Sequence, residues 1–242
     1  MNSDNFFNLG QHTVKSYDAE IEEIRSKVLA MGGMVSQQLT DAISAITTGD
    51  SGLGEKVVNG DYKINALEVE IDEECGQVLA RRQPIASDLR FILSVIKTIT
   101  DLERMGDEAE RIGRMAVQLA QHDRPRGEYR ELKHLGEKAS HMLNSALDAF
   151  ARTDVEAAVR TREEDQDLDR EYESIMRQMI TLMMEDPRYI PRTLEAMWSA
   201  RALERIGDRA CNICEYVIFL VKGRDVRHTS WEQVQAELRD ED

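Results

Sequence analysis

The residues best suited to chemistry are two pairs of carboxylates, each inside a hexapeptide that occurs twice. Leu-Glu-Arg-Met-Gly-Asp at 102–107 returns 101 residues later with isoleucine in place of methionine. Residues four apart share one face of a helix, so Glu103 lies beside Asp107. Glu204 and Asp208 have the same relation in the second copy. Like charges at this spacing destabilise a helix unless a positive charge compensates them, so each pair suits a hard metal cation or a basic surface of a partner protein.

The repetition is a stronger signal than the spacing. The chain has 46 acidic residues among 242, so carboxylates four apart are common by chance. Both copies also keep a glycine, which costs about 1 kcal/mol relative to alanine inside a helix. We therefore expect Gly106 and Gly207 to admit the close approach of another backbone or a bound group. The alternative is that the acids are solvated and paired with Arg104 and Arg205 of the hexapeptides.

The acidic face differs between the two copies. In the second copy it continues through Asn212 and Glu215, whereas the first copy has Arg111 and Arg114 there, with Glu110 offset on the neighbouring row. The preceding helix of each half is expected to supply opposing polar groups. These are Asp61, Asn65, Glu68 and Asp72 in the first half, and Asp165 and Asp169 in the second.

Long helices must position these residues. Apolar residues recur at three- and four-residue spacing, and the four prolines lie outside the strongest periodic stretches. The predicted helical spans are 21–46, 57–79 and 89–119, followed by 132–150, 154–184 and 193–221. Asp50 and Asp154 are expected to cap the second span of each half. Short connections between such helices favour antiparallel neighbours.

The two halves repeat each other in order and spacing, which indicates a duplicated three-helix unit. We therefore predict an all-α fold of two tandem antiparallel three-helix bundles related by internal duplication. The expected divisions are a flexible N-terminus at 1–16, a first repeat at 17–122, a second repeat at 128–222 and an acidic tail at 223–242.

Composition excludes several classes of protein. The formal net charge of −15 opposes nucleic-acid binding, although Arg81, Arg82 and Arg90 form a local basic patch. The longest apolar runs are too short to span a bilayer, and the first residues lack the pattern of a signal peptide. Three cysteines argue against a disulfide framework and for a reducing, cytoplasmic compartment. No phosphate-binding loop or nucleophile with a general base is evident, so we do not expect an enzyme.

Several stretches resemble the PhoU family of bacterial accessory proteins of phosphate-specific transport. They are VLAMGGMVSQQLTDAI at 28–43, IDEECGQVLARRQPIASDLR at 71–90, the two hexapeptides, YESIMRQMITLMMEDPR at 172–188 and RIGDRACNICEYVIFLVKG at 205–223. The resemblance covers roughly residues 17–228. It implies two similar three-helix bundles side by side in a protein that is commonly a homodimer.

The resemblance also implies a function. PhoU-like proteins are cytoplasmic negative regulators of the phosphate-starvation response, thought to connect the ATPase PstB of the phosphate ABC transporter to the sensor kinase PhoR. Such a protein restrains phosphate uptake and reaches the membrane only through its partners. We assign partner binding to four arginines: Arg81, Arg82, Arg104 and Arg205. The two alternatives are a metal-dependent enzyme or metal store, and a plain helical scaffold without a link to phosphate.

Some members of this family bind metal clusters through the repeated carboxylate motif. No metal is expected to be required, but iron, manganese, magnesium and zinc are the candidates. The matching positions are Glu103 and Asp107 in the first half, and Glu204, Asp208, Asn212 and Glu215 in the second. We expect the second site to be the better one, because Arg111 replaces asparagine in the first.

Overall fold

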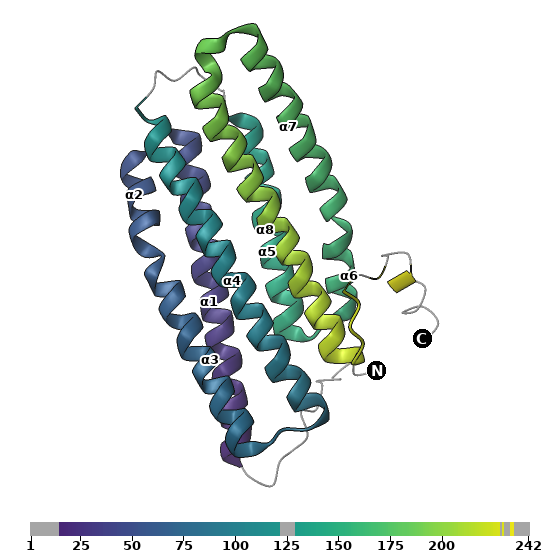
Figure 1. Ribbon diagram of the computed structural model, residues 1–242. Helices are drawn as coiled ribbons and strands as arrows, with labels where there is room; N and C mark the ends of the chain where they lie inside the picture. The colour runs from purple at the N-terminus through teal and green to yellow at the C-terminus, as the bar shows by residue number, and fades with distance from the viewer. Residues whose placement is uncertain (1–14, 122–128, 228, 230–232, 235–242) are drawn as a thin grey trace, which may run out of the picture.

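The chain folds into long helices, and no strand occurs in the part that the structure describes. The computed structural model describes residues 15–121, 129–227, 229 and 233–234. Its helices are α1 (Lys15–Thr48), α2 (Ser51–Gly60), α3 (Tyr62–Arg82), α4 (Ala86–Leu119), α5 (Arg130–Arg152), α6 (Val155–Glu163), α7 (Asp165–Glu185) and α8 (Ile190–Lys222), with a 3-10 turn η1 (Pro187–Tyr189) before α8 (Figure 1). The predicted all-α class is confirmed. None of these helices is both long and apolar enough to cross a membrane.

The second helical span of each half is divided, which corrects the single helices expected at 57–79 and 154–184. In the first half the chain turns at Asp61, between α2 and α3. The Asp61 carboxylate accepts hydrogen bonds from Gln38 Nε2 (3.0 Å) and Asn65 Nδ2 (3.1 Å). Side chains of this type compete with regular helix formation through such local bonds. The break in the second half falls at Glu164.

The expected caps are confirmed. The backbone N–H of Leu53 donates to Asp50 Oδ1, and that of Ala157 donates to Asp154 Oδ1, both at 2.9 Å. Each bond satisfies one of the N–H groups that a helix start leaves without an intrahelical partner. The two halves therefore begin their second span with the same local structure.

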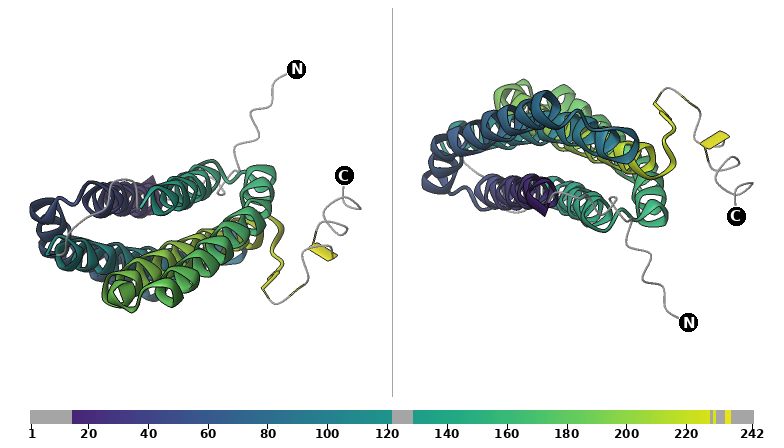
Figure 2. Two further views of the ribbon diagram at one scale, coloured as in Figure 1. Left: turned by 90° about the horizontal axis from the view of Figure 1, so that it is seen from above. Right: turned by 90° about the horizontal axis from the view of Figure 1, so that it is seen from below.

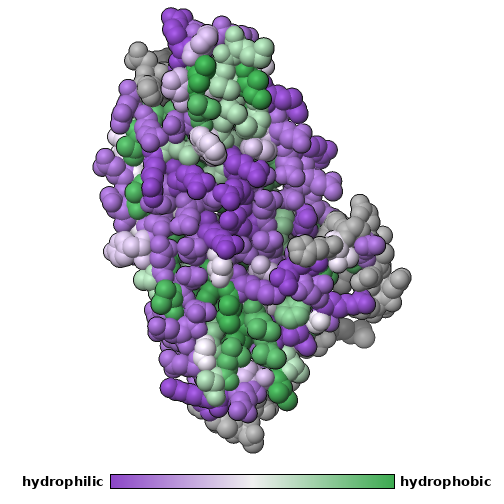
Figure 3. Space-filling model, viewed as in Figure 1, coloured by the Kyte–Doolittle hydropathy of each residue, from purple (hydrophilic) through white to green (hydrophobic). Residues whose placement is uncertain are grey.

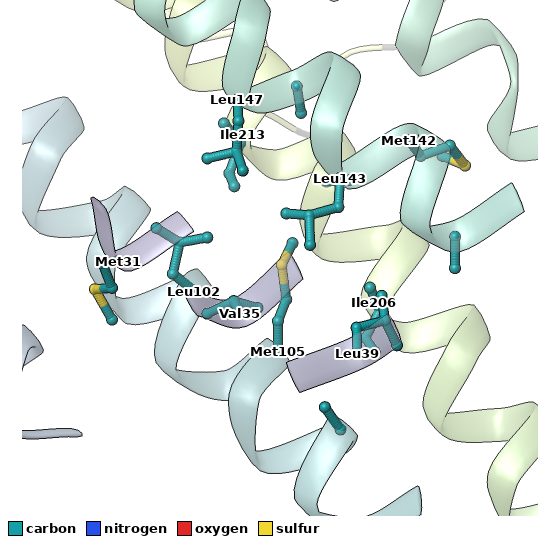
Figure 4. Close-up of a cluster of buried hydrophobic side chains, with 14 of the residues drawn as sticks. Met31, Val35, Leu39, Leu102, Met105, Met142, Leu143, Leu147, Ile206 and Ile213 are labelled. Carbon is teal, nitrogen blue, oxygen red and sulfur yellow. The ribbon is translucent and has the colours of Figure 1, made fainter. Parts of the chain in front are cut away.

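The helices form two layers. Figure 2 shows α1 and α5 on one side and α4 and α8 on the other, with α2–α3 and α6–α7 closing the two edges. The most extensive helix contact is between α4 and α8, one from each half. Val35, Leu102, Leu143 and Ile206 are fully buried where the two layers meet (Figure 4). The two three-helix repeats thus share one continuous core.

The ends of the chain lie largely outside the described residues, as does the connection between the repeats at 122–128. The predicted flexible N-terminus at 1–16 and most of the acidic tail at 223–242 therefore stay predictions. Two of the described tail residues, Val226 and Val234, are buried against Ile218 of α8, with Val155 and Val159 of α6 beside them. Part of the tail consequently packs on the second repeat.

Two neighbouring glycines in α1 have different surroundings, and substitution is expected to affect stability in opposite directions. A Cβ at Gly32 would lie 2.6 Å from Leu147 Cδ2 on α5, whereas a Cβ at Gly33 would have no such neighbour within 4 Å. We expect Gly32→Ala to lower the free energy of unfolding by about 1–3 kcal/mol through overpacking. Gly33→Ala should raise it by up to about 1 kcal/mol through helix propensity. Urea unfolding of both variants measures the difference, and equal effects would contradict the close α1–α5 approach.

Candidate functional site

Both hexapeptides divide their side chains between the core and one outer face. Leu102 and Met105 of α4, like Leu203 and Ile206 of α8, are buried in the shared core. Helical geometry then turns the carboxylates of the hexapeptides away from that contact. The duplicated motif therefore does two tasks: it joins the repeats and it presents acids on α4 and α8.

The glycines of the motif admit side chains of the same chain, in place of the backbone or bound group that the sequence predicted. A Cβ at Gly106 would lie 3.2 Å from Asp61 Oδ1, and one at Gly207 would lie 2.1 Å from Leu168 Cδ2. The approaching group is a carboxylate in the first half and a leucine of α7 in the second. The same close approach thus brings a charged side chain to the glycine in the first repeat and an apolar one in the second.

The first half gathers three carboxylates that fit a metal ion. Asp61, Asp107 and Glu110 each offer an oxygen, and these oxygens all lie within 4.8 Å of one another. Gln38 and Asn65 fix the position of the Asp61 carboxylate through the hydrogen bonds described above. Gln38 Oε1 and Asn65 Oδ1 are buried and have no hydrogen-bond partner among the described residues. The donor set is entirely oxygen, which suits magnesium, manganese or iron better than a softer metal.

The electrostatics of this cluster favour a cation. Burial, followed by the charges of Asp61 and Glu110, raises the pKa of Asp107. Burial, followed by the charges of Asp107 and Glu68, raises the pKa of Glu103. These shifts express the cost of ionising neighbouring carboxylates together, which a bound cation would remove. We name Asp61, Asp107 and Glu110 the first-repeat carboxylate cluster.

Two residues of this cluster were not among the predicted ligands, since Asp61 was expected only as an opposing polar group. Glu110 had been placed on a neighbouring row of the helix, yet its carboxylate reaches the same group as Asp107, although Arg114 also pairs with it at 2.5 Å. The sequence does contain a sign of this: Glu110 is three residues after Asp107, and residues three apart also share a helix face. Glu103 lies in the same acidic region without belonging to the group of three.

In the second half, arginines occupy the corresponding space. Arg201 pairs with Glu204, and Arg162 pairs with Asp165 at 2.9 Å and with Glu215 at 3.9 Å. The repeat places Thr100 and Val58 where these two arginines stand. Asn212 Nδ2 donates to Asp101 Oδ1 at 3.5 Å, across the contact between α8 and α4. The geometry therefore favours the first half as a metal site and reverses the expected ranking.

The pairing of the hexapeptide acids with Arg104 and Arg205, which was the alternative to a binding site, does not occur in the described residues. Arg205 Nη1 pairs instead with Glu108 Oε1 of α4 at 2.7 Å. Glu108 also forms an ion pair with Arg111, at 3.1 Å. Arg104 makes no ion pair or hydrogen bond within the described part of the chain, and it lines the same cavity as Arg205. Arg104 and Arg205 therefore line one cavity, near the middle of α4 and α8.

The other predicted partner-binding arginines lie elsewhere, at the end of α3. Arg81 is exposed, and Arg82 pairs with Glu20 of α1 at 2.6 Å. Arg90, which was expected to join them, donates from Nε to the carbonyl oxygen of Leu220 at 3.1 Å. That bond satisfies a carbonyl group at the C-terminal end of α8. The basic patch is therefore smaller than expected, and the four predicted arginines form two separate surfaces.

Glu204 makes the stability of the fold depend on pH. Burial, followed by the charge of Asp208, raises the pKa of Glu204 to about 7, and its Oε2 has no hydrogen-bond partner among the described residues. An acid whose pKa is raised by folding lowers stability above that pKa and has no such effect below its unfolded-state value. Glu204→Gln should therefore raise the free energy of unfolding at about pH 8 by on the order of 1–2 kcal/mol, with the gain disappearing towards about pH 4.5.

A neighbouring glutamate provides the opposite control for urea unfolding across this pH range. Burial disfavours the charged form of Glu171, but hydrogen bonds from Lys138 and His134 outweigh it and lower the pKa of Glu171. Glu171→Gln should therefore lose stability at about pH 8, a loss that shrinks as acid protonates the wild-type group. A gain for Glu204→Gln that persists unchanged at acid pH would contradict the proposed cost of ionisation.

Known proteins match this chain over nearly its full length. The model of the PhoU domain matches twice, at residues 28–116 and 132–217, once in each repeat. The chain is 50% identical over 232 residues to a phosphate-specific transport system accessory protein PhoU homolog of Pseudomonas putida, covering 96% of this chain and 90% of that protein. It is 47% identical over 236 residues to the phosphate-specific transport system accessory protein PhoU of Escherichia coli (strain K12), covering 97% of both.

Solved structures agree with the sequence comparisons. The crystal structure of PhoU from Pseudomonas aeruginosa matches with a TM-score of 0.83 and 49% sequence identity, covering 86% of this chain and all of that one. The phosphate transport system regulatory protein PhoU from Streptococcus pneumoniae matches with a TM-score of 0.80 and 30% identity, covering 87% of this chain and 99% of that one. Repeated motif, paired bundles and comparisons agree, and the chain belongs to the PhoU family.

Proposed function

We propose that this chain is a cytoplasmic, non-enzymatic adaptor that represses the phosphate-starvation response. In this role it connects a PstB-type ATPase of the phosphate ABC transporter to a PhoR-type sensor kinase and restrains phosphate uptake. Relatives nearly half identical to this chain are named accessory proteins of phosphate-specific transport systems. The chain reaches the membrane only through these partners. The observation that carries the proposal is a pair of exposed apolar patches, one on each repeat.

The first patch, named the α4 patch, consists of Ile85, Leu89 and Leu93 at the start of α4. The second, named the α7–α8 patch, consists of Ile180 and Met184 of α7 with Ile190, Leu194 and Trp198 of α8. Leu89 and Leu93 correspond in the repeat to Ile190 and Leu194. On the face of the molecule drawn in Figure 3, hydrophobic surface lies towards both ends of the helices, and a hydrophilic band separates the two regions.

Two such patches fit a protein that binds two partners. Clustered exposed apolar side chains mark docking surfaces, because leaving them in water has a free-energy cost that a partner removes. The duplication supplies one patch at each end of the molecule, far enough apart for separate partners. Arg81 and Arg82 precede the α4 patch and would provide its basic rim.

The expected homodimer would also need a contact surface. We propose that a second copy of the chain binds at one of these two patches, either in competition with a partner or together with it.

The test is complementation. The chain is expressed in a bacterium that lacks its own family member, and alkaline phosphatase activity is measured in phosphate-rich medium. Restored repression is the expected result. Persistent high activity, with the protein folded and present and with no capture of its own transporter ATPase in a pull-down, would contradict the adaptor function.

Metal binding is the second candidate function, and the first-repeat carboxylate cluster favours it. We propose that Asp61, Asp107 and Glu110 hold a magnesium, manganese or iron ion, with Glu103 beside them. The second-half residues Glu204, Asp208, Asn212 and Glu215 are proposed as the weaker site, because Arg162 and Arg201 already compensate its charges. Less than one equivalent of metal after both aerobic and anaerobic purification would count against a metal-dependent function.

A further inference from the structure

A cavity near the middle of the molecule is lined almost entirely by charged side chains. It has a volume of about 440 Å³ and collects residues from α4, α6, α7 and α8, so both repeats contribute. Its lining includes four arginines (Arg104, Arg162, Arg205 and Arg209) and four carboxylates (Asp101, Asp165, Asp208 and Glu215). Equal numbers of the two charges distinguish it from the first-repeat carboxylate cluster.

Several of these charges are already paired. Arg162 is engaged with Asp165 and Glu215, and Arg205 with Glu108. Asp101 accepts a hydrogen bond from Tyr216 Oη at 2.8 Å. These contacts form the walls of the cavity and leave fewer groups available to a ligand.

Two arginines and one carboxylate remain available. Arg104 and Asp208 have no ion pair or hydrogen bond among the described residues. Arg209 donates only from Nη1 to the carbonyl oxygen of Arg205, at 3.3 Å, and its Nε is buried without a hydrogen-bond partner. Guanidinium groups present several N–H donors in a fixed plane that matches the oxygens of phosphate-like anions. A carboxylate in the same cavity needs a donor from the ligand.

We propose that this cavity binds a tetrahedral oxyanion that carries a proton at neutral pH, as inorganic hydrogen phosphate does. Arg104 and Arg209 donate to its ionised oxygens, and its protonated oxygen donates to Asp208. Sulfate has the same shape but no proton to donate at neutral pH, so its oxygens would face the carboxylate directly. The site therefore prefers phosphate to sulfate. The choice of phosphate as the first probe rests on the proposed function, whereas the site itself rests on these side chains.

Calorimetry on the full chain tests the proposal with inorganic phosphate, adenosine monophosphate and sulfate as separate probes. A chelator is kept in the buffer, so that no phosphate is held through a metal ion at the first-repeat carboxylate cluster or at Asp208, Asn212 and Glu215, which line the cavity. We expect saturable binding of phosphate, and binding of sulfate weaker by about tenfold or more. A phosphate monoester loses its second proton at about pH 6, so adenosine monophosphate should also bind more weakly than inorganic phosphate at neutral pH.

Variants locate the site. Arg104→Gln and Arg209→Gln should each weaken phosphate binding by about tenfold or more. Arg177→Gln is the matched control, because Arg177 lies exposed on α7, paired with Glu173, and does not line the cavity. Arg104 is exposed and makes no bond that supports the fold, so its variant stays folded. Absence of saturable binding up to about 10 mM phosphate, equal binding of sulfate, or unchanged affinity in Arg104→Gln would overturn the proposal. Failure of complementation with intact phosphate binding would instead count against the adaptor function.

Discussion

A chain with both Leu194→Glu and Trp198→Glu is expected to fold as the wild type does and to lose repression in the complementation assay. The two side chains are 41% and 55% exposed, so the substitutions remove little buried surface from the fold. In a complex the same side chains would be desolvated. The substitutions would then remove apolar contacts and place two carboxylates in the interface, each of which costs several kcal/mol. We expect binding to weaken by about 100-fold or more, which corresponds to about 3 kcal/mol.

Two further variants make this test specific. Val69→Glu places one such carboxylate at an apolar residue of α3 that is also 55% exposed but belongs to neither patch, and it should repress normally. The matching change on the other repeat, Leu89→Glu with Leu93→Glu, tests whether each patch serves its own partner. Pull-downs with the transporter ATPase and the kinase should then lose one partner with each pair of substitutions. Normal repression by the α7–α8 variant, at wild-type protein level, would show that this patch is not a docking surface.

The repeat is the part of the fold that the sequence predicts well. A hexapeptide with apolar residues three apart and acids four apart defines a buried and an exposed face in each copy. In the first copy both faces are found, with Leu102 and Met105 in the core and Glu103 and Asp107 outside it, whereas in the second copy Glu204 is buried. The helix period is sufficient for this division, because it depends only on positions along one helix.

What lies opposite each face depends on neighbouring helices, and the sequence did not determine it. Asp61 reaches the Asp107 face because α3 begins there, after a break that a continuous apolar pattern does not reveal. Arg162 comes from α6 and neutralises Asp165 and Glu215, although nothing in the hexapeptide indicates its presence. Ranking the two halves as metal sites therefore required the structure, even though most of the candidate acids were identified from spacing.

The divergence between the repeats leads to a prediction about metal binding. Asp107 belongs to three carboxylates whose oxygens converge and of which only Glu110 pairs with an arginine among the described residues, whereas its repeat equivalent, Asp208, lies beside the Arg162–Asp165 pair. Replacing Asp107 by asparagine removes one charged ligand while keeping the shape of the side chain. We expect manganese affinity to fall by roughly 100-fold, since even changes outside the ligand set lower metal affinity by 10- to 100-fold. Asp208→Asn should change it little.

Metal-free protein is titrated with manganese in a calorimeter, which measures the affinity. The thermal midpoint of unfolding is then compared with and without manganese. Bound metal should raise the midpoint of wild type and of Asp208→Asn, because it binds the folded state alone. Misfolding does not account for a loss of binding by Asp107→Asn. Burial, with Asp61 and Glu110, raises the pKa of Asp107, so the neutral variant without metal should be at least as stable as wild type at neutral pH. An equal loss of manganese affinity in both variants would instead assign the metal to both halves and contradict the role of Arg162 as a substitute for the cation.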